Sequence, residues 1–385
     1  MQITPVLLSG ILLAATIALA QDDGSLLDKI QIHGNLAQGV LFSSSNNYLS
    51  AKSSDGSFQW TEGAISFGTS VMENLRIGLQ LHSYSLGQIG KQKPTLDWAF
   101  GDYKLKPYFG IRVGKVKTPM GWFNDVQDID AVHQWALLPQ GVYEADMKSF
   151  NLAHNGFLAY GDVTPSKKIG TLSYQVYAGS RSQDRDEGFT MQMAAAGINL
   201  GDCSGPTKGL DVRWALPVKG VTLGTSYQRV HLSAPGATRG GSPLPINLKY
   251  SIWDFYGQYE LGKLTLDAEW NIYPTHQYYG PAPDWYAPLR TWYAMASYRL
   301  TSKLALGAYY SNLWFYNYGN RDNSDPGNYQ KDVVLNSRYD INSHFYFKLE
   351  GHYIHGLAGG FYSVVNPNGL EKDTKLLAAR VGFTF

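Results

Sequence analysis

A strict two-residue alternation of apolar and polar side chains is the feature that most limits how this chain can fold. In the segment "LRIGLQLHSY", apolar residues at 75, 77, 79 and 81 alternate with polar residues or glycine. The segments "KLTLDAEWNI" and "FYFKLEGHYI" repeat the pattern further along. Because successive side chains of a strand point to opposite faces, each segment predicts a strand with one apolar and one polar face. The pattern recurs from about residue 30 to the C-terminus, which predicts an all-β fold.

The connections between these segments fall into two length classes that alternate along the chain. Short turns are expected at 73–74, 106–107, 164–168, 217–220, 261–263, 301–303 and 342–343. Long loops are expected at about 44–56, 87–94, 118–150, 181–208, 233–247, 274–289, 317–330 and 356–374. Seven short turns alternating with eight long loops predict sixteen strands. An even number places both termini on the side of the short turns.

This organisation predicts a transmembrane antiparallel β-barrel with short periplasmic turns and long extracellular loops. Each strand would have about 9 to 13 residues, the length that a tilted strand needs to cross a bilayer. Lipid cannot satisfy an open sheet edge, so the strands must close on themselves. A soluble β-propeller is the alternative, since later hairpins recur about every 40 residues. It is disfavoured because the repeats carry no blade signature and the turns split into two size classes.

Composition excludes several other classes of protein. Charged residues make up 16% of the chain, against about 25% in typical soluble domains. The 32 Lys and Arg residues are balanced by 31 Asp and Glu residues, so no basic face for nucleic acid is expected. Cys203 is the single cysteine, and the fold therefore does not rely on a disulfide framework.

The N-terminal residues 1–20, "MQITPVLLSGILLAATIALA", predict a secretory signal peptide cleaved after Ala20. A membrane anchor is the alternative, which the shortness of the apolar run disfavours. Residues 21–29 would form a short N-terminal segment and residues 30–385 the barrel. No later run of 18 apolar residues occurs, which excludes a helical membrane protein. We expect export through the periplasm to the cell outer membrane.

If the apolar row of each strand faces lipid, the other row lines the interior with many ionisable side chains. An isolated charge in a dry interior is very costly, so these groups require water or tight pairing. A barrel of about sixteen strands is wide enough for an aqueous channel, which makes water the simpler expectation. The predicted basic wall of this channel consists of Arg76, Arg112, Arg338, Lys348 and Arg380.

The segment 118–149, after the fifth predicted strand, is too long and too apolar for a surface loop. Its large apolar side chains, among them Trp122 and Trp135, need something to pack on, and the barrel interior offers it. Folded inward, the segment would constrict the pore and oppose bases such as Arg112 and Arg380, giving a transverse field that discriminates ions. The predicted acidic residues of this constriction are Asp125, Asp128, Asp130, Glu144 and Asp146.

Other interpretations of these acidic residues stay open at the level of sequence. They could be solvated loop charges, or caps of a short helix across 129–138. A calcium site in "DVQDID" is weaker, because the glycine and the bidentate glutamate of an EF-hand loop are absent. His133 is expected to be a polar helix residue rather than a metal ligand. No metal or other cofactor is predicted.

The chain ends in "LLAARVGFTF", which predicts a closing strand. Leu377, Ala379, Val381, Phe383 and Phe385 form its apolar, lipid-facing row, and Arg380 lies on the opposite, inner row.

Together these features resemble the Gram-negative outer-membrane porins, and "GIRVGKVKTPMGWFNDVQDID" (110–130) is similar to the phosphate-selective and dicarboxylate-channel groups. The resemblance implies an eyelet loop after strand five, a homotrimer in outer-membrane lipid, and passive diffusion of ions and small hydrophilic solutes without enzymatic activity. It also implies that the last strand, with Val381, Phe383 and Phe385, is the signal read by the barrel assembly machinery. The inward bases here are matched by acids, unlike the arginine ladder of phosphate-selective members. The dicarboxylate-channel group carries an N-terminal helical extension, whereas only about nine residues of the expected mature chain precede the first strand here. A general or weakly selective pore is therefore expected.

Two other functions are considered. A nonconducting barrel for adhesion or assembly would fit the long loops and would have a plugged lumen. An outer-membrane barrel hydrolase would need a nucleophile or base beside His82 or His352. No GxSxG or HExxH motif occurs in the chain.

Overall fold

The computed structural model describes residues 29–183, 188–281, 285–286, 288–316 and 324–385. The predicted signal peptide, 1–20, and all but the last residue of the predicted segment 21–29 lie outside the described residues.

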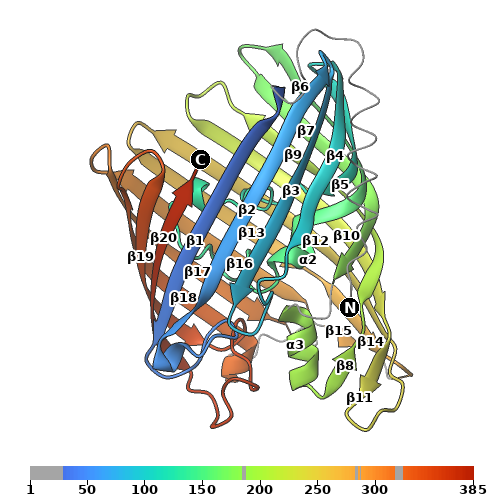
Figure 1. Ribbon diagram of the computed structural model, residues 1–385, viewed down its shortest axis with the longest axis vertical. Coiled ribbons are helices and arrows are strands. Elements are labelled where there is room, and N and C mark those ends of the chain that lie inside the picture. Colours follow the sequence, from blue (N-terminus) through green and yellow to red (C-terminus); the bar gives the residue numbers. More distant parts are fainter. Residues whose placement is uncertain (1–28, 184–187, 282–284, 287, 317–323) are drawn as a thin grey trace.

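Within these ranges, sixteen antiparallel strands form one closed barrel (Figure 1). Each strand pairs with the next along the chain, and the last pairs with the first from Asn35 to Ser43, which closes the sheet. The prediction of an all-β barrel of about sixteen strands is confirmed. The barrel strands are β1 (Gln31–Ser43), β2 (Ser57–Met72), β3 (Leu75–Leu86), β4 (Thr95–Lys106), β5 (Phe109–Lys117), β6 (Ala153–Ser166), β7 (Gly170–Gln183), β9 (Cys203–Ala215), β10 (Val221–Ala234), β12 (Ile246–Leu261), β13 (Leu264–Tyr273), β16 (Leu289–Arg299), β17 (Leu304–Phe315), β18 (Tyr329–Asp340), β19 (Phe345–Gly356) and β20 (Asp373–Thr384).

Shorter elements belong to the connections. They are β8 (Ile198–Leu200), β11 (Gly236–Thr238), β14 (Thr275–Tyr279), β15 (Trp285–Tyr286), α2 (Lys148–Leu152), α3 (Gly188–Ala195) and the 3-10 turns Ser53–Asp55, Asp130–Val132 and Pro326–Asn328. In Figure 1, α3, β8, β11, β14 and β15 gather at the lower end of the barrel, where the long loops lie. Among the described residues, no helix has both the length and the apolar character needed to cross a membrane.

The two classes of connection occur where the alternation places them. Residues 73–74 join β2 to β3 and residues 262–263 join β12 to β13, each as a two-residue turn. Gly262 has a φ of 62°, the backbone conformation that tight hairpin turns demand and glycine adopts without strain. We call this the short-turn end of the barrel, and the opposite one the long-loop end.

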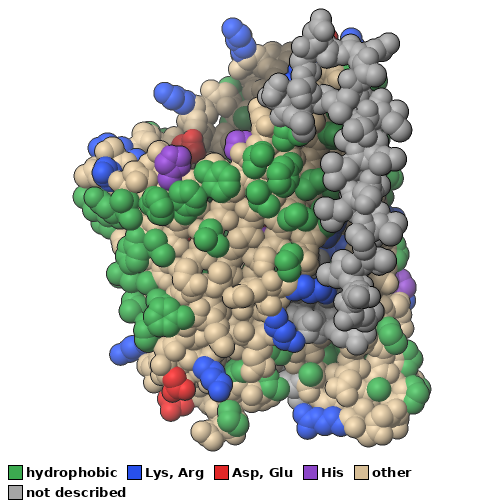
Figure 2. Space-filling model, viewed as in Figure 1, with side chains coloured by type: hydrophobic (Ala, Val, Ile, Leu, Met, Phe, Trp, Pro, Cys, Tyr) green, Lys and Arg blue, Asp and Glu red, His purple; other side chains and the backbone are tan. Residues whose placement is uncertain are grey.

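The outer face of the barrel is apolar. Figure 2 shows hydrophobic side chains over the outer faces of β1, β19 and β20, with Lys and Arg nearer the two ends. In β20, Leu377 and Val381 are each 45% exposed, whereas Arg380 between them is 4% exposed. Exposed outward residues include Leu36, Phe157, Val176, Leu223, Trp253, Phe255, Trp270, Leu306, Leu335, Phe347 and Leu349. An apolar belt of this kind is the surface that a bilayer covers.

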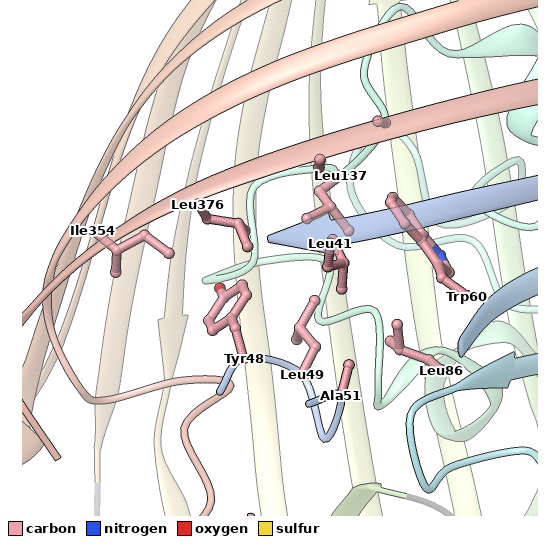
Figure 3. Packing of buried hydrophobic residues seen from close by; sticks show 11 residues of the cluster. Leu41, Tyr48, Leu49, Ala51, Trp60, Leu86, Leu137, Ile354 and Leu376 are labelled. Carbon is pink, nitrogen blue, oxygen red and sulfur yellow. The ribbon is translucent and has the colours of Figure 1, made fainter. Parts of the chain in front are cut away.

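Much of the interior is packed rather than open. The β1–β2 loop folds inward, so that Tyr48 and Leu49 lie beside Leu137 of the segment 118–147 and beside Leu376 of β20 (Figure 3). Charged wall residues lie under this packing: Lys348 and Glu350 are both fully buried. The simpler expectation of a wall solvated by water is therefore wrong for β18 to β20, where the charges are paired instead.

Near the long-loop end of β12, the inner row of residues is apolar and the outer row is polar, the opposite of the rest of the strand. From 246 to 252 the inward residues are apolar, namely Ile246, Leu248, Tyr250 and Ile252, while Lys249 points outward. Further along, Trp253 and Phe255 are the exposed apolar row and Asp254 is buried. The apolar inner surface packs with β10, Met120 and the buried free Cys203. A rule of polar inside and apolar outside therefore fails where β12 has other protein on its inner face.

Candidate pore constriction

The segment 118–147 leaves β5 and crosses the barrel interior. At its first turn, Gly121 has a φ of 60°, and a Cβ there would collide with the carboxylate oxygens of Glu269 and Asp254. The Gly121 amide donates to Ser226 Oγ at 3.1 Å, and the Trp122 amide donates to Tyr143 Oη at 2.8 Å. Glycine therefore lets the loop backbone touch the inner faces of β10, β12 and β13.

Asp128 is held on the opposite side, against β3 and the end of β5. Its carboxylate accepts from Lys117 Nζ at 2.6 Å and from Gln80 Nε2 at 2.6 Å. The side chain is fully buried. Lys117 is the last residue of β5, so the loop is fastened to the strand that it leaves.

Asp130 lies at the centre of a buried charge network. Its Oδ1 is 3.0 Å from both Lys348 Nζ and Arg380 Nη1, and its Oδ2 accepts from Tyr346 Oη at 2.7 Å. Arg380 also bonds Glu62 Oε2 at 2.7 Å, and Glu62 is in turn paired with Lys148. Burial alone would raise the pKa of Asp130, but the two cations outweigh it and hold that pKa below its ordinary value.

Main-chain groups of the loop are also satisfied by wall side chains. Arg338 donates to the carbonyl oxygens of Ala131 and His133 at 2.7 and 2.6 Å. The carboxylate of Glu350 accepts from the amides of Ala136 and Leu137 at 2.7 and 2.9 Å. A helix across 129–138 is absent, and only the 3-10 turn Asp130–Val132 forms. Side chains of the barrel wall bond the main-chain groups that would be bonded within such a helix.

One edge of the loop remains accessible to water. Asp125 is 34% exposed at its side chain and its Oδ1 lies 3.8 Å from Arg213 Nη2, which is 24% exposed. Arg112, 33% exposed, pairs with Asp102 at 3.0 Å and lies over the ring of Tyr160. We call Asp125, Arg112, Asp102 and Arg213 the open strip. It follows the inner faces of β4, β5 and β9.

The predicted residues therefore separate into groups. Asp128, Asp130, Lys348, Arg380 and Arg338 fasten the loop, whereas Asp125 and Arg112 lie in the open strip. Arg76 is exposed near the short-turn end, opposite Asp102 in the strand register. Asp146 is buried and accepts from Tyr362 Oη.

Glu144 differs from the other acids of the loop. It lines a cavity of about 500 Å³ at the long-loop end. Burial, and to a lesser degree the neighbouring Asp146, raise the pKa of Glu144 to about 8.

Sequence reasoning missed Glu62, Lys117 and Lys148 as loop anchors. Glu62 lies on the inner row of β2, and the two lysines flank the inward segment on either side. A lysine at each end of an acid-rich inward loop was the sequence feature that could have predicted these anchors.

The described residues contain no group of three or more His, Cys, Asp or Glu side chains arranged to hold a metal ion. The carboxylates of "DVQDID" diverge, since Asp125 approaches Arg213, Asp128 binds Lys117 and Asp130 binds Lys348. His133 Nε2 lies 2.8 Å from the carbonyl oxygen of Val126.

Comparison with known proteins finds similarity of structure alone. No protein-family model matches the chain, and no curated protein matches its sequence. Among solved structures, OmpT of Vibrio cholerae, an outer-membrane protein, aligns with a TM-score of 0.59 at 12% identity over 95% of this chain and 99% of that one. Another OmpT structure is described as a trimer form.

Two other solved structures align over slightly less of this chain. An anion-selective porin from Comamonas acidovorans gives a TM-score of 0.58 at 9% identity, over 92% of this chain and 99% of that one. OmpF of Salmonella typhi, in a complex with daunomycin, gives 0.56 at 12% identity, over 92% and 97%. The chain therefore has the fold of the porin-like outer-membrane β-barrels.

Proposed function

We propose that this protein is an outer-membrane porin, which lets ions and small hydrophilic solutes diffuse passively through a barrel narrowed by the loop 118–147. The observation that carries the proposal is the open strip, where a charged loop edge meets basic side chains that water reaches. Charged, hydrated walls at a constriction pass ions without binding them tightly. A second cavity, of about 570 Å³, lies at the short-turn end and is lined by Ala131 and Arg338. The loop thus borders cavities towards both ends of the barrel.

Weak ion selectivity follows from the charges of the open strip. Arg112 pairs with Asp102, and Arg213 lies between Asp211 at 3.1 Å and Asp125 at 3.8 Å, so acids and bases alternate along the strip. A path lined by both signs of charge has no strong preference for anions or cations.

Planar bilayer recordings test this proposal. Purified protein should give stepwise conductance, and Asp125→Asn should shift the reversal potential in a salt gradient towards anion preference. Arg213→Gln should shift it towards cation preference, while Glu371→Gln, which removes an exposed acid outside the strip, should leave it unchanged. A silent bilayer at high protein input would sink the proposal. Unchanged ion selectivity in both Asp125→Asn and Arg213→Gln would contradict the assignment of the open strip to the constriction.

We further propose a homotrimer in outer-membrane lipid, inserted by the barrel assembly machinery. The trimer form described for OmpT supports this assembly. Conductance should then rise in groups of three equal steps.

A nonconducting barrel for adhesion or assembly is the second candidate. It is favoured by the buried charge pairs that fasten the loop across the interior, since Lys348 and Glu350 have no exposed surface. The bilayer recordings separate the two functions.

We expect no catalytic activity. His352 lies 3.0 Å from Asp332 and 3.3 Å from Glu350, and His82 lies 2.9 Å from Glu62. Both rings are buried against the wall, at about 5% exposure each. A buried histidine among carboxylates, out of reach of substrate, serves structure rather than hydrolysis.

A further inference from the structure

The cavity at the long-loop end has a wall that a channel for hydrophilic solutes does not need. Its volume is about 500 Å³, and its lining combines side chains of β12, β13, the inward loop and α3. Most of that lining is apolar and includes Met120, Met147, Met193, Leu248, Ile252 and Phe361. Cavities of roughly 300 to 1,000 Å³ with apolar walls and a few polar groups are typical of small-molecule sites.

The apolar wall is built into the strands. The inner row of β12 is apolar from 246 to 252 and becomes polar at Asp254. Leu248, Tyr250 and Ile252 of that row line the cavity. Three methionines lie around the same space, and their unbranched, polarisable side chains adapt to ligands of different shape. The cavity therefore suits a molecule with an apolar body.

One carboxylate reaches this apolar cavity. Glu144 is among its lining residues, and within the described parts of the chain no donor bonds or pairs with that carboxylate. Asp146, two residues along, adds a second acidic group close by. The ionised form of such a carboxylate is unfavourable in apolar surroundings without a partner, so a cation that enters the cavity would stabilise the ionised form by pairing with it.

We propose that this cavity binds a small organic cation, with its ammonium group at Glu144 and its aromatic or aliphatic body against the methionines and rings. Tyr250, Tyr273 and Phe361 supply π-faces that also attract ammonium groups. The inference rests on the proposed pore function, because the proposed cation is a solute that would bind inside the pore near its long-loop end.

Binding is measured on the full chain refolded in detergent micelles, by isothermal titration calorimetry. The probes are benzyltrimethylammonium, the uncharged benzyl alcohol and the anionic benzoate. The cation should bind saturably with a stoichiometry of one, and the other two should bind at least tenfold more weakly. Equal binding of all three probes, or no saturable binding of the cation, would overturn the proposal. This comparison uses the unmodified protein and needs no variant to fold.

Variants then assign the carboxylate. Glu144→Gln keeps the size of the side chain and should weaken benzyltrimethylammonium binding at least tenfold. Glu371→Gln removes an exposed acid outside the cavity and should leave binding unchanged. Equal affinities of Glu144→Gln and the unmodified protein would place the cation elsewhere and contradict the assignment.

The same probe separates this inference from the proposed function. In a planar bilayer, benzyltrimethylammonium added on the long-loop side should reversibly reduce the conductance, and should do so less in Glu144→Gln. Conductance without binding would support the pore function and contradict the proposed binding site. Binding in micelles without conductance in the bilayer would support the binding site and contradict the pore function.

Discussion

At the scale of single residues, the acids of the inward loop illustrate two ways of placing a carboxylate inside a barrel. Asp128 and Asp130 are buried against cations, so each charge is compensated. Glu144 has no such cation among the described residues. Its environment favours the neutral form, because burial penalises the ionised carboxylate more than the neutral acid.

A pH-dependent stability follows from the raised pKa of Glu144. Between about pH 4.5 and 8, the folded chain keeps a proton that the unfolded chain releases, so this group's contribution to the free energy of unfolding falls as pH rises. Glu144→Gln does not titrate and should be more stable than the unmodified protein at pH 9, with a smaller difference at pH 5. Urea unfolding in lipid vesicles at both values measures this. Glu371→Gln is the control, and a difference for Glu144→Gln that does not change with pH would contradict the prediction.

At the scale of elements, the seam between β20 and β1 explains part of the terminal aromatic residue. The Phe385 amide and carbonyl each bond Gly34 at 3.0 Å. A Cβ at Gly34 would collide with the Phe385 ring, so the ring covers a glycine of the first strand. An aromatic ring over a glycine across a strand pair stabilises the register. The porin resemblance predicts an assembly signal in addition to this packing role.

Phe385→Ala should separate these two roles. We expect a strong decrease of folded protein in outer membranes, because the predicted assembly signal would be lost, and only a small loss of stability after refolding in detergent. Heat-modifiable electrophoretic mobility measures the folded fraction in both settings. Phe109→Ala, another exposed aromatic near the short-turn end, should lower neither. Equal losses in cells and in detergent would reduce Phe385 to a packing residue.

At the scale of the whole molecule, the segment 118–147 serves as the core of the barrel. It contacts β2, β3, β10, β12, β13 and β16 to β20 through side chains and main chain. A barrel whose outside is apolar cannot place its hydrophobic core between layers as a soluble domain does. The loop supplies that core instead, and the charged wall residues hold it there.

Removal of one anchor should therefore affect global stability. Lys348→Met leaves Asp130 buried with one cation fewer, and loss of a partner from a buried ion pair costs about 3–5 kcal/mol. Urea unfolding in lipid vesicles should detect this decrease. Lys331→Met, an exposed lysine on the neighbouring strand β18, should change stability by less than about 0.5 kcal/mol. Similar losses in both variants would contradict the anchoring role of Lys348.

Several parts of the candidate site could be predicted from the sequence. Segment 118–149 stands out by its length and its tryptophans, and the strand alternation places Arg112, Lys348 and Arg380 on the inner face. The sequence did not predict which acidic residues of the segment are buried in ion pairs and which are accessible to water. Asp125 and Asp130 are five residues apart in the same inward segment, yet Asp125 is accessible and Asp130 is buried against β19 and β20.

The sequence by itself determined the strands, the two classes of connection and the even strand number. These are local properties, because a period of two follows from the geometry of a strand wherever one face meets an apolar medium. Only the tertiary structure decided which charges pair, where the inner row of β12 is apolar and which cavity Glu144 reaches. The physical reason is distance along the chain: the partners of Asp130 lie more than 200 residues away, and only closure of the barrel brings them together.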